Sequence, residues 1–284
     1  MEAAVQSRSL GAWYSSVPRY DLRQTHSASR APGNVEKNRY SDIVAYDSTR
    51  VLLTPNEFNG QSDYINANHV NMTLTGSNTV YRYIATQGPK SSTVSDFWQL
   101  ILEQGIRQIV MLTTLQEGDM IKCFKYWPEE GTKMKDLLGS WSIQQVGMSQ
   151  EDAWIQRQFE VKNEKTGEER HVTHLQYVKW PDHGVPQDSQ DFVDFVHLVR
   201  EFRAEAPIAP VVVHCSAGVG RTGVFIMMET AMGLIEEGQA VRPQQLLQIM
   251  REQRPSLVQT ESQFNFVVGA ILRVFIEGSV QPCS

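Results

Sequence analysis

One short segment of the chain combines a thiol, a guanidinium and flexible backbone. Cys215 and Arg221 stand six positions apart, with Gly218 and Gly220 between them. Glycine lets successive backbone N–H groups turn toward one centre and form a concave anion site. Arginine offers a planar fork that matches two phosphoryl oxygens, which lysine does not. The spacing therefore predicts a phosphate-binding loop that carries its own nucleophile.

The loop lies between the two elements that this chemistry needs. Residues 211–213 are a run of valines typical of a buried strand, and helical periodicity begins at Thr222. The positive end of that helix and the inward N–H groups should favour the thiolate form of Cys215. An inert buried cysteine in an ordinary turn is the alternative, and the coincidence of strand, loop and helix disfavours it.

The remaining loop residues receive supporting roles. We expect His214 to organise the loop by hydrogen bonding rather than to act as a base, and we count Thr222 among the catalytic residues. The expected phosphate-binding residues of the loop are Ser216, Ala217, Gly218, Val219 and Gly220.

The totals narrow the functional class. The chain has 284 residues, of which 41% are hydrophobic and 20% charged, as in an ordinary globular domain. A net charge of −6 argues against a nucleic-acid partner. Neither a membrane segment nor an export signal is expected, because the apolar runs are short. Three widely spaced cysteines and seven scattered histidines indicate a reducing compartment and no metal or other cofactor.

Hydrophobic periodicity predicts one α/β domain with a mixed sheet flanked by helices. Strand-like runs occupy residues 64–70, 81–86, 109–114 and 172–178, and helical patterns occupy residues 93–104, 192–204, 222–237 and 261–277. We expect an N-terminal arm and loop at residues 1–34, a catalytic domain at 35–278 and a tail at 279–284. The arm carries Trp13 and Tyr14, which could dock it on the body.

The loop sequence His-Cys-x5-Arg-Thr-Gly resembles the signature of the cysteine-dependent protein tyrosine phosphatases. Six further blocks resemble family blocks in family order, at residues 38–42, 63–68, 86–89, 122–123, 180–186 and 259–263. The resemblance covers about residues 34–277. It implies the family's highly twisted mixed sheet and the hydrolysis of phosphotyrosine in proteins through a phosphocysteine at Cys215.

The resemblance also implies roles outside the loop. Asp182, in Trp-Pro-Asp-His-Gly-Val-Pro, would be the general acid on a loop that closes over the substrate. Gln259 would orient the attacking water, with Gln263 as a second polar contact. Tyr40 would set the depth of the pocket so that phosphotyrosine reaches the thiol, and Asp42 would hold the substrate backbone.

A supporting loop completes the expected site, in which Lys122 and Glu117 pair near the acid. Two alternatives remain open: an inactive domain that only captures phosphotyrosine, and a dual-specificity phosphatase with a shallower pocket. Within the family, the chain most resembles non-receptor enzymes that carry FERM and PDZ modules elsewhere. A cytoplasmic, monomeric signalling phosphatase that acts on phosphotyrosine-containing proteins is the resulting expectation.

Overall fold

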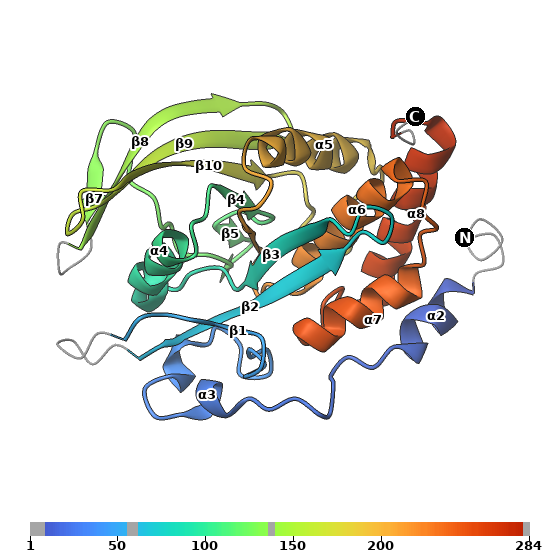
Figure 1. Ribbon diagram of the computed structural model, residues 1–284, viewed down its shortest axis with the longest axis horizontal. Coiled ribbons are helices and arrows are strands. Elements are labelled where there is room, and N and C mark those ends of the chain that lie inside the picture. Colours follow the sequence, from blue (N-terminus) through green and yellow to red (C-terminus); the bar gives the residue numbers. More distant parts are fainter. Residues whose placement is uncertain (1–8, 56–61, 136–139, 281–284) are drawn as a thin grey trace.

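The computed structural model describes residues 9–55, 62–135 and 140–280. Nine strands form one mixed sheet in the order β1-β2-β3-β11-β4-β10-β9-β8-β7 (Figure 1). The bounds are β1 (Arg50–Leu52), β2 (Tyr64–Thr73), β3 (Val80–Thr86), β4 (Gln108–Met111), β7 (Lys133–Lys135), β8 (Trp141–Gln150), β9 (Trp154–Asn163), β10 (Glu169–Tyr177) and β11 (Val211–His214). A separate two-stranded sheet pairs β5 (Gln116–Glu117) with β6 (Met120–Ile121).

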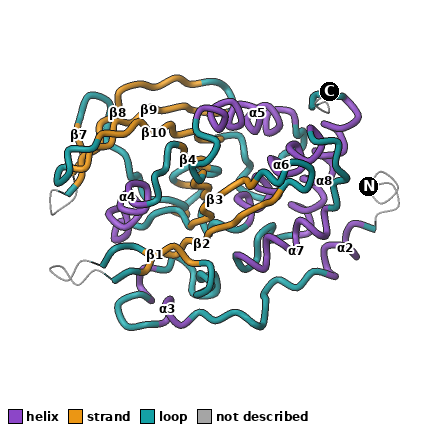
Figure 2. The backbone as a smooth tube through the Cα atoms, viewed as in Figure 1, coloured by secondary structure: helices purple, strands orange, loops and turns teal. Residues whose placement is uncertain are grey.

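Helices cover both faces of the sheet (Figures 1 and 2). Their bounds are α2 (Leu10–Ser16), α3 (Ser27–Arg30), α4 (Val94–Glu103), α5 (Gln190–Glu205), α6 (Gly220–Glu236), α7 (Pro243–Gln253) and α8 (Glu261–Glu277), with 3₁₀ turns η1 (Val35–Lys37) and η2 (Ser91–Thr93). The expected α/β class with a mixed sheet flanked by helices is confirmed.

The short strand β11 lies in the interior of the sheet and runs parallel to both of its neighbours, β3 and β4. All four of its residues are buried, as β-branched runs in doubly covered parallel strands usually are. Its side chains alternate between two apolar cores. Val211 and Val213 face the core that holds α5, α6 and α8, while Val212 faces the core that holds α4. The strand therefore delivers its carboxyl end from a fixed position.

Helix α6 continues directly from the loop after β11 and is buried along almost its whole length. Helix α8 packs beside it and begins with a reciprocal cap, in which the Thr260 side chain accepts from the Gln263 N–H. It ends at Gly278, whose φ of +65° is the left-handed conformation that glycine adopts without strain.

The N-terminal arm lies against the body over its described residues (Figure 1). The Tyr14 hydroxyl donates to the Gln259 carbonyl at 2.6 Å, and its ring packs 5.8 Å from that of Phe264 on α8. Arg251 on α7 donates to the Val17 carbonyl and stacks over the Tyr14 ring. The aromatic residues of the arm thus anchor it, whereas the proposed domain boundaries stay a prediction.

Several elements were absent from the sequence-based description, and the three longest of them are β8, β9 and α7. Strands β8 and β9 form a long antiparallel pair, and helix α7 begins at Pro243. In the sequence of β8 and β9, polar residues such as Gln144, Gln156 and Gln158 break up the apolar runs, because only the side chains on one face of each strand are apolar. Helix α7 is polar over most of its surface and buries a narrow stripe. Without their tertiary partners, the sequences of these strands and of this helix look like those of loops.

Candidate active site

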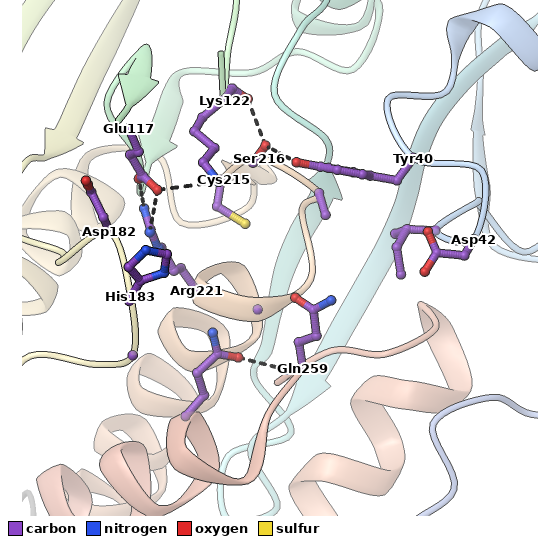
Figure 3. Close-up of a pocket in the computed structure, with 15 residues that line it drawn as sticks. Tyr40, Asp42, Glu117, Lys122, Asp182, His183, Cys215, Ser216, Arg221 and Gln259 are labelled. Carbon is purple, nitrogen blue, oxygen red and sulfur yellow. Dashed lines mark hydrogen bonds and ion pairs between the residues drawn. The ribbon is translucent and has the colours of Figure 1, made fainter. Parts of the chain in front are cut away.

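A pocket of about 360 Å³ opens where β11 passes into α6 (Figure 3). Twelve of the expected site residues line it: Tyr40, Asp42, Glu117, Lys122, Asp182, Cys215, Ser216, Ala217, Gly220, Arg221, Gln259 and Gln263. The other four, His214, Gly218, Val219 and Thr222, are buried residues of the same loop. The fold thus brings together segments that are more than 200 positions apart.

The Cys215 side chain points into this pocket (Figure 3) and is 5% exposed. The Thr222 hydroxyl, in the first turn of α6, donates toward the sulfur at 3.4 Å. A hydroxyl donor and the positive end of a buried helix both stabilise negative charge on sulfur. The position suits a nucleophile that a ligand reaches only through the pocket.

The loop turns its carbonyl groups outward. Every carbonyl from residue 214 to residue 219 accepts a hydrogen bond from a group outside the pocket. The carbonyls of residues 214, 215 and 216 accept from the Leu112 N–H, the His214 ring and the Gly88 N–H, respectively. Those of residues 217 and 218 accept from Nη2 and Nε of Arg254. The carbonyl of residue 219 accepts from the N–H groups of Gly223 and Val258. No acceptor in the described part of the chain meets the N–H groups of residues 216–219. Those N–H groups are left to bind an anion.

Gly218 is required by the close approach of a neighbouring strand. Its φ is +70°, and a Cβ at this position would lie 2.0 Å from the Thr86 carbonyl oxygen at the end of β3. Any other residue would clash with backbone and adopt a strained conformation. The loop can therefore curl tightly only with glycine here.

His214 is fully buried under the loop. Its Nδ1 lies 3.1 Å from the Cys215 carbonyl oxygen and its Nε2 lies 2.8 Å from the Tyr126 hydroxyl. Burial lowers the pKa of His214 to about 4, so the ring is neutral at physiological pH. These contacts support the expected organising role.

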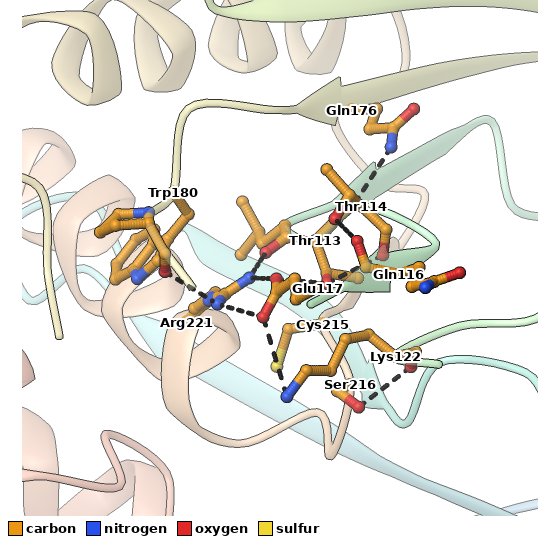
Figure 4. Close-up of polar contacts among 12 residues, drawn as sticks. Thr113, Thr114, Gln116, Glu117, Lys122, Gln176, Trp180, Cys215, Ser216 and Arg221 are labelled. Atoms are coloured by element: carbon orange, nitrogen blue, oxygen red, sulfur yellow. Dashed lines mark hydrogen bonds and ion pairs between the residues drawn. The ribbon is translucent and has the colours of Figure 1, made fainter. Parts of the chain in front are cut away.

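Arg221 is held by a carboxylate (Figure 4). Its Nη2 donates to Glu117 Oε2 at 3.0 Å, its Nη1 donates to Glu117 Oε1, and the Leu112 carbonyl accepts from Nη1 at 3.2 Å. Lys122 Nζ stands 3.8 Å from Glu117 Oε2. The expected pairing of Lys122 with Glu117 is therefore present, and Glu117 has the further role of orienting the guanidinium in its plane.

Asp182 lies on an exposed loop at the rim of the pocket. The loop is joined to the floor because the carbonyl of Pro181 accepts from Arg221 Nη2 at 3.2 Å. Trp180, just before Pro181, is 5% exposed and packs against Phe192 and Phe266. Its indole donates to the Gly184 carbonyl and so ties the two ends of the turn together. The Asp182 carboxyl is thus carried on an exposed turn at the pocket entrance, next to the buried Trp180 indole.

Tyr40 forms one wall of the pocket (Figure 3), where its hydroxyl and the Ser216 hydroxyl are 3.0 Å apart. Asp42 is exposed beside it at the mouth. The segment before Tyr40 is anchored by Lys90, whose ammonium donates to the Asn38 carbonyl at 3.1 Å and to that of Glu36. A ring held at its hydroxyl and at its backbone can present a fixed face to an aromatic ligand.

Gln259 extends its amide into the pocket opposite Tyr40 (Figure 3). The side chain of Gln263 accepts from the Gln259 N–H at 3.0 Å and from the Thr260 N–H at 3.3 Å. Gln263 therefore positions the backbone of Gln259, besides lining the pocket itself. The amide of Gln259 keeps both a donor and an acceptor for a ligand.

Arg254 was missed by the sequence analysis. It is fully buried and donates to the carbonyls of Ala217 and Gly218 and to the side chains of Asn66 and Asn68. Burial lowers its pKa to about 10, which leaves it charged at neutral pH. Its partners are far from it in sequence, so no local pattern marked this arginine.

Two further observations bear on other classes of site. Among the residues that the structure describes, no group of three or more His, Cys, Asp or Glu side chains could hold a metal ion. Within the same ranges, none of the helices is long and apolar enough to span a bilayer.

Comparison with known proteins agrees with this geometry. The family model described as protein-tyrosine phosphatase matches residues 34–273. Tyrosine-protein phosphatase non-receptor type 4 is 49% identical over 261 residues in both Mus musculus and Homo sapiens, which covers 91% of this chain and 27% of those proteins. Tyrosine-protein phosphatase 1 of Caenorhabditis elegans is 45% identical over 253 residues, or 89% of this chain and 24% of that protein.

The chain spans about a quarter of the length of these relatives. The non-receptor designation of the mouse and human relatives agrees with the subgroup that the sequence resembled. The family model covers most of the chain. The nucleophile loop, the acid and the arginine also converge on one pocket. The chain therefore belongs to the protein-tyrosine phosphatase family.

Proposed function

We propose that this chain hydrolyses phosphotyrosine in proteins through a phosphocysteine intermediate at Cys215. The observation that carries the proposal is the convergence of the Cys215 thiol, the Arg221 guanidinium and the loop N–H groups on one pocket, because the loop carbonyls turn outward. The names of the relatives, tyrosine-protein phosphatases, support the substrate class.

In the first step the Cys215 sulfur attacks phosphorus and the tyrosyl oxygen leaves. The free N–H groups of the loop and Arg221 stabilise the charge on the phosphoryl oxygens as it redistributes. Asp182 supplies a proton to the leaving oxygen, whose parent phenol has a pKa of about 10 and departs slowly as an anion.

In the second step water attacks the phosphocysteine and releases phosphate and the thiolate. Gln259 orients the water through its amide, and Asp182, now a carboxylate, accepts the proton. One acid thus serves both half-reactions.

The walls of the pocket account for the choice of phosphotyrosine. Tyr40 stacks on the substrate ring and sets a depth that a phosphoserine does not span, while Asp42 holds the peptide backbone at the mouth. No observation favours an inactive binding domain, because the nucleophile, the arginine and the acid line the same pocket.

We further propose a monomeric catalytic domain at residues 35–278, preceded by a docked arm and followed by a short tail. Its partners are phosphotyrosine-containing proteins, and its location is the cytoplasm. Two free buried thiols, Cys123 and Cys215, support a reducing compartment.

The test compares two thiol variants. Cys215→Ser should abolish release of phosphate from a phosphotyrosyl peptide and retain binding of that peptide, because the loop survives without its nucleophile. Cys123→Ser is the matched control: burial raises the pKa of this thiol to about 12, so it takes no part in chemistry and turnover should persist. Turnover by Cys215→Ser would contradict the covalent mechanism. If the unaltered protein released phosphate equally fast from a phosphoseryl and a phosphotyrosyl peptide, the proposed specificity would be wrong.

A further inference from the structure

Arg157 on β9 is a buried guanidinium that the proposed reaction does not use. It is 8% exposed, and its guanidinium carbon lies 4.6 Å from the centre of the Trp127 ring. Its Nη1 donates in two directions, to His174 Nδ1 at 3.4 Å and to Gln176 Oε1 at 2.9 Å. A single nitrogen with two hydrogens thus begins two chains of hydrogen bonds.

The first chain ends at the peptide of the nucleophile. The Tyr126 hydroxyl lies 2.8 Å from His174 Nε2 and 2.8 Å from His214 Nε2, and His214 Nδ1 lies 3.1 Å from the Cys215 carbonyl oxygen. Burial lowers the pKa of both imidazoles, to about 4 for His214 and well below its usual value for His174. Each ring is therefore neutral and carries one proton.

The two ends of this chain fix where every proton sits. A carbonyl oxygen only accepts, so His214 carries its proton on Nδ1 and its Nε2 must accept from Tyr126. The single Tyr126 proton is then used, since the Met111 sulfur at 3.9 Å is a farther and weaker acceptor. His174 must consequently donate from Nε2, which leaves its Nδ1 as the acceptor that Arg157 meets.

Without Arg157, His174 could place its proton on Nδ1 instead. Its Nε2 would then compete with His214 for the one Tyr126 proton. If His214 lost that donor, its own proton could move to Nε2, and the Nδ1 lone pair would face the Cys215 carbonyl. Two facing acceptors repel, and the peptide that carries the thiol would shift.

The second chain ends at the phosphate-binding arginine (Figure 4). The Gln176 amide donates to the Thr113 carbonyl at 3.0 Å, and the Thr113 hydroxyl donates to Glu117 Oε1 at 3.0 Å. Glu117 in turn holds Arg221. The amide of Gln176 is oriented this way because Arg157 occupies its oxygen.

We propose that Arg157 is a positioning residue that fixes the tautomers of His174 and His214, and through them the position of the Cys215 peptide. Its second hydrogen bond, to Gln176, orients the chain of bonds that ends at Glu117, which holds Arg221. The consequence for turnover rests on the proposed function, but the tautomers are a property of the unliganded protein. They can be measured whether or not the chain hydrolyses phosphotyrosine.

The first measurement uses the unaltered protein. Nitrogen chemical shifts of ¹⁵N-histidine-labelled chain at neutral pH should place the proton of His214 on Nδ1 and that of His174 on Nε2. Assignment comes from the loss of one ring's signals in His174→Gln. Either ring in the opposite tautomer, or a charged ring, would overturn the proposal.

The second measurement uses Arg157→Met, with Arg170→Met as the matched control. Arg170 lies on the neighbouring strand β10 and donates to the Leu102 carbonyl and to Glu168, away from the pocket. Arg157→Met should introduce the second tautomer at His174 or His214 and lower kcat about tenfold, which corresponds to about 1.4 kcal/mol, with little change in KM. Arg170→Met should change neither. A folded Arg157→Met with unaltered tautomers would refute the assignment.

A second pair of variants decides the case if Arg157→Met does not fold. In His174→Gln the amide can accept from Arg157 and donate to Tyr126, whereas in His174→Leu the side chain can do neither. The kcat of the glutamine variant should exceed that of the leucine variant about tenfold. Equal values would show that the chain of bonds does not reach the nucleophile.

Discussion

The two imidazoles that share the Tyr126 hydroxyl should make the stability of the fold depend on pH. Burial holds the pKa of His214 at about 4, against about 6.5 for a histidine in an unfolded chain. Between these values the unfolded state binds more protons than the folded state. The free energy of unfolding is therefore fully retained above about pH 6.5 and falls as the pH is lowered toward 4.

The size of the loss follows from these two pKa values. At pH 5.0, His214 alone should cost about 2 kcal/mol of unfolding free energy relative to pH 7.5. His174, whose pKa burial also lowers, should add to that loss in the same direction. A domain is commonly stable by only about 5–15 kcal/mol, so the change is readily measured.

Urea unfolding followed by tryptophan fluorescence at pH 7.5 and pH 5.0 gives the difference directly. His174→Gln should shrink it, because the amide keeps the hydrogen bonds and does not titrate. His171→Gln, an exposed position on the same strand, is the control and should leave it unchanged. A wild-type loss well below 2 kcal/mol, or an equal loss in His174→Gln, would refute the reasoning.

Three other substitutions test the pocket. Asp182→Ala should lower kcat/KM for phosphotyrosine about 10²–10⁴-fold, and the penalty should shrink for aryl phosphates with more acidic phenols; a penalty independent of the leaving group would mean that Asp182 only shapes its loop. Lys90→Met should raise KM for a phosphotyrosyl peptide more than it lowers kcat, because the segment before Tyr40 loses two anchors; unchanged steady-state constants would contradict this. Gly218→Ala should abolish phosphopeptide binding in calorimetry, since the added carbon meets the Thr86 carbonyl at 2.0 Å, and normal affinity would show that the loop can relax.

The parts of the site that were predictable from sequence are those that are continuous in it. The loop from His214 to Thr222 holds its nucleophile, glycines and arginine within nine positions, and strand and helix patterns on either side give their context. Asp182, Tyr40 and Gln259 were assigned their roles only through blocks that resemble the family, because an acid in a turn or an amide at a helix start is more often an ordinary turn or surface residue.

What escaped prediction is contact between residues distant in sequence. Arg254, which the sequence did not mark, meets Asn66 and Asn68 across more than 180 positions. Arg221 and Glu117 were both expected in the site, but their bond across 104 positions was not. A buried arginine looks like a surface arginine in a sequence, since nothing local records which carbonyls it will face. The polar side chains of β8 and β9 hid those strands for a related reason: Arg157 on β9 is buried because it donates to His174 and Gln176 on the neighbouring strand β10.

The bond from the Tyr14 hydroxyl to the Gln259 carbonyl closes a chain segment of 245 positions. During synthesis the nucleophile loop emerges from the ribosome before Gln259 and the helix that Thr260 caps, and Tyr14 of the arm lacks its Gln259 and Phe264 partners until then. Domains with many contacts distant in sequence fold slowly and late for this reason. A nascent chain would therefore hold Cys215 in an unfinished pocket, and the proposed hydrolysis of phosphotyrosine would begin only when almost the whole domain had left the ribosome.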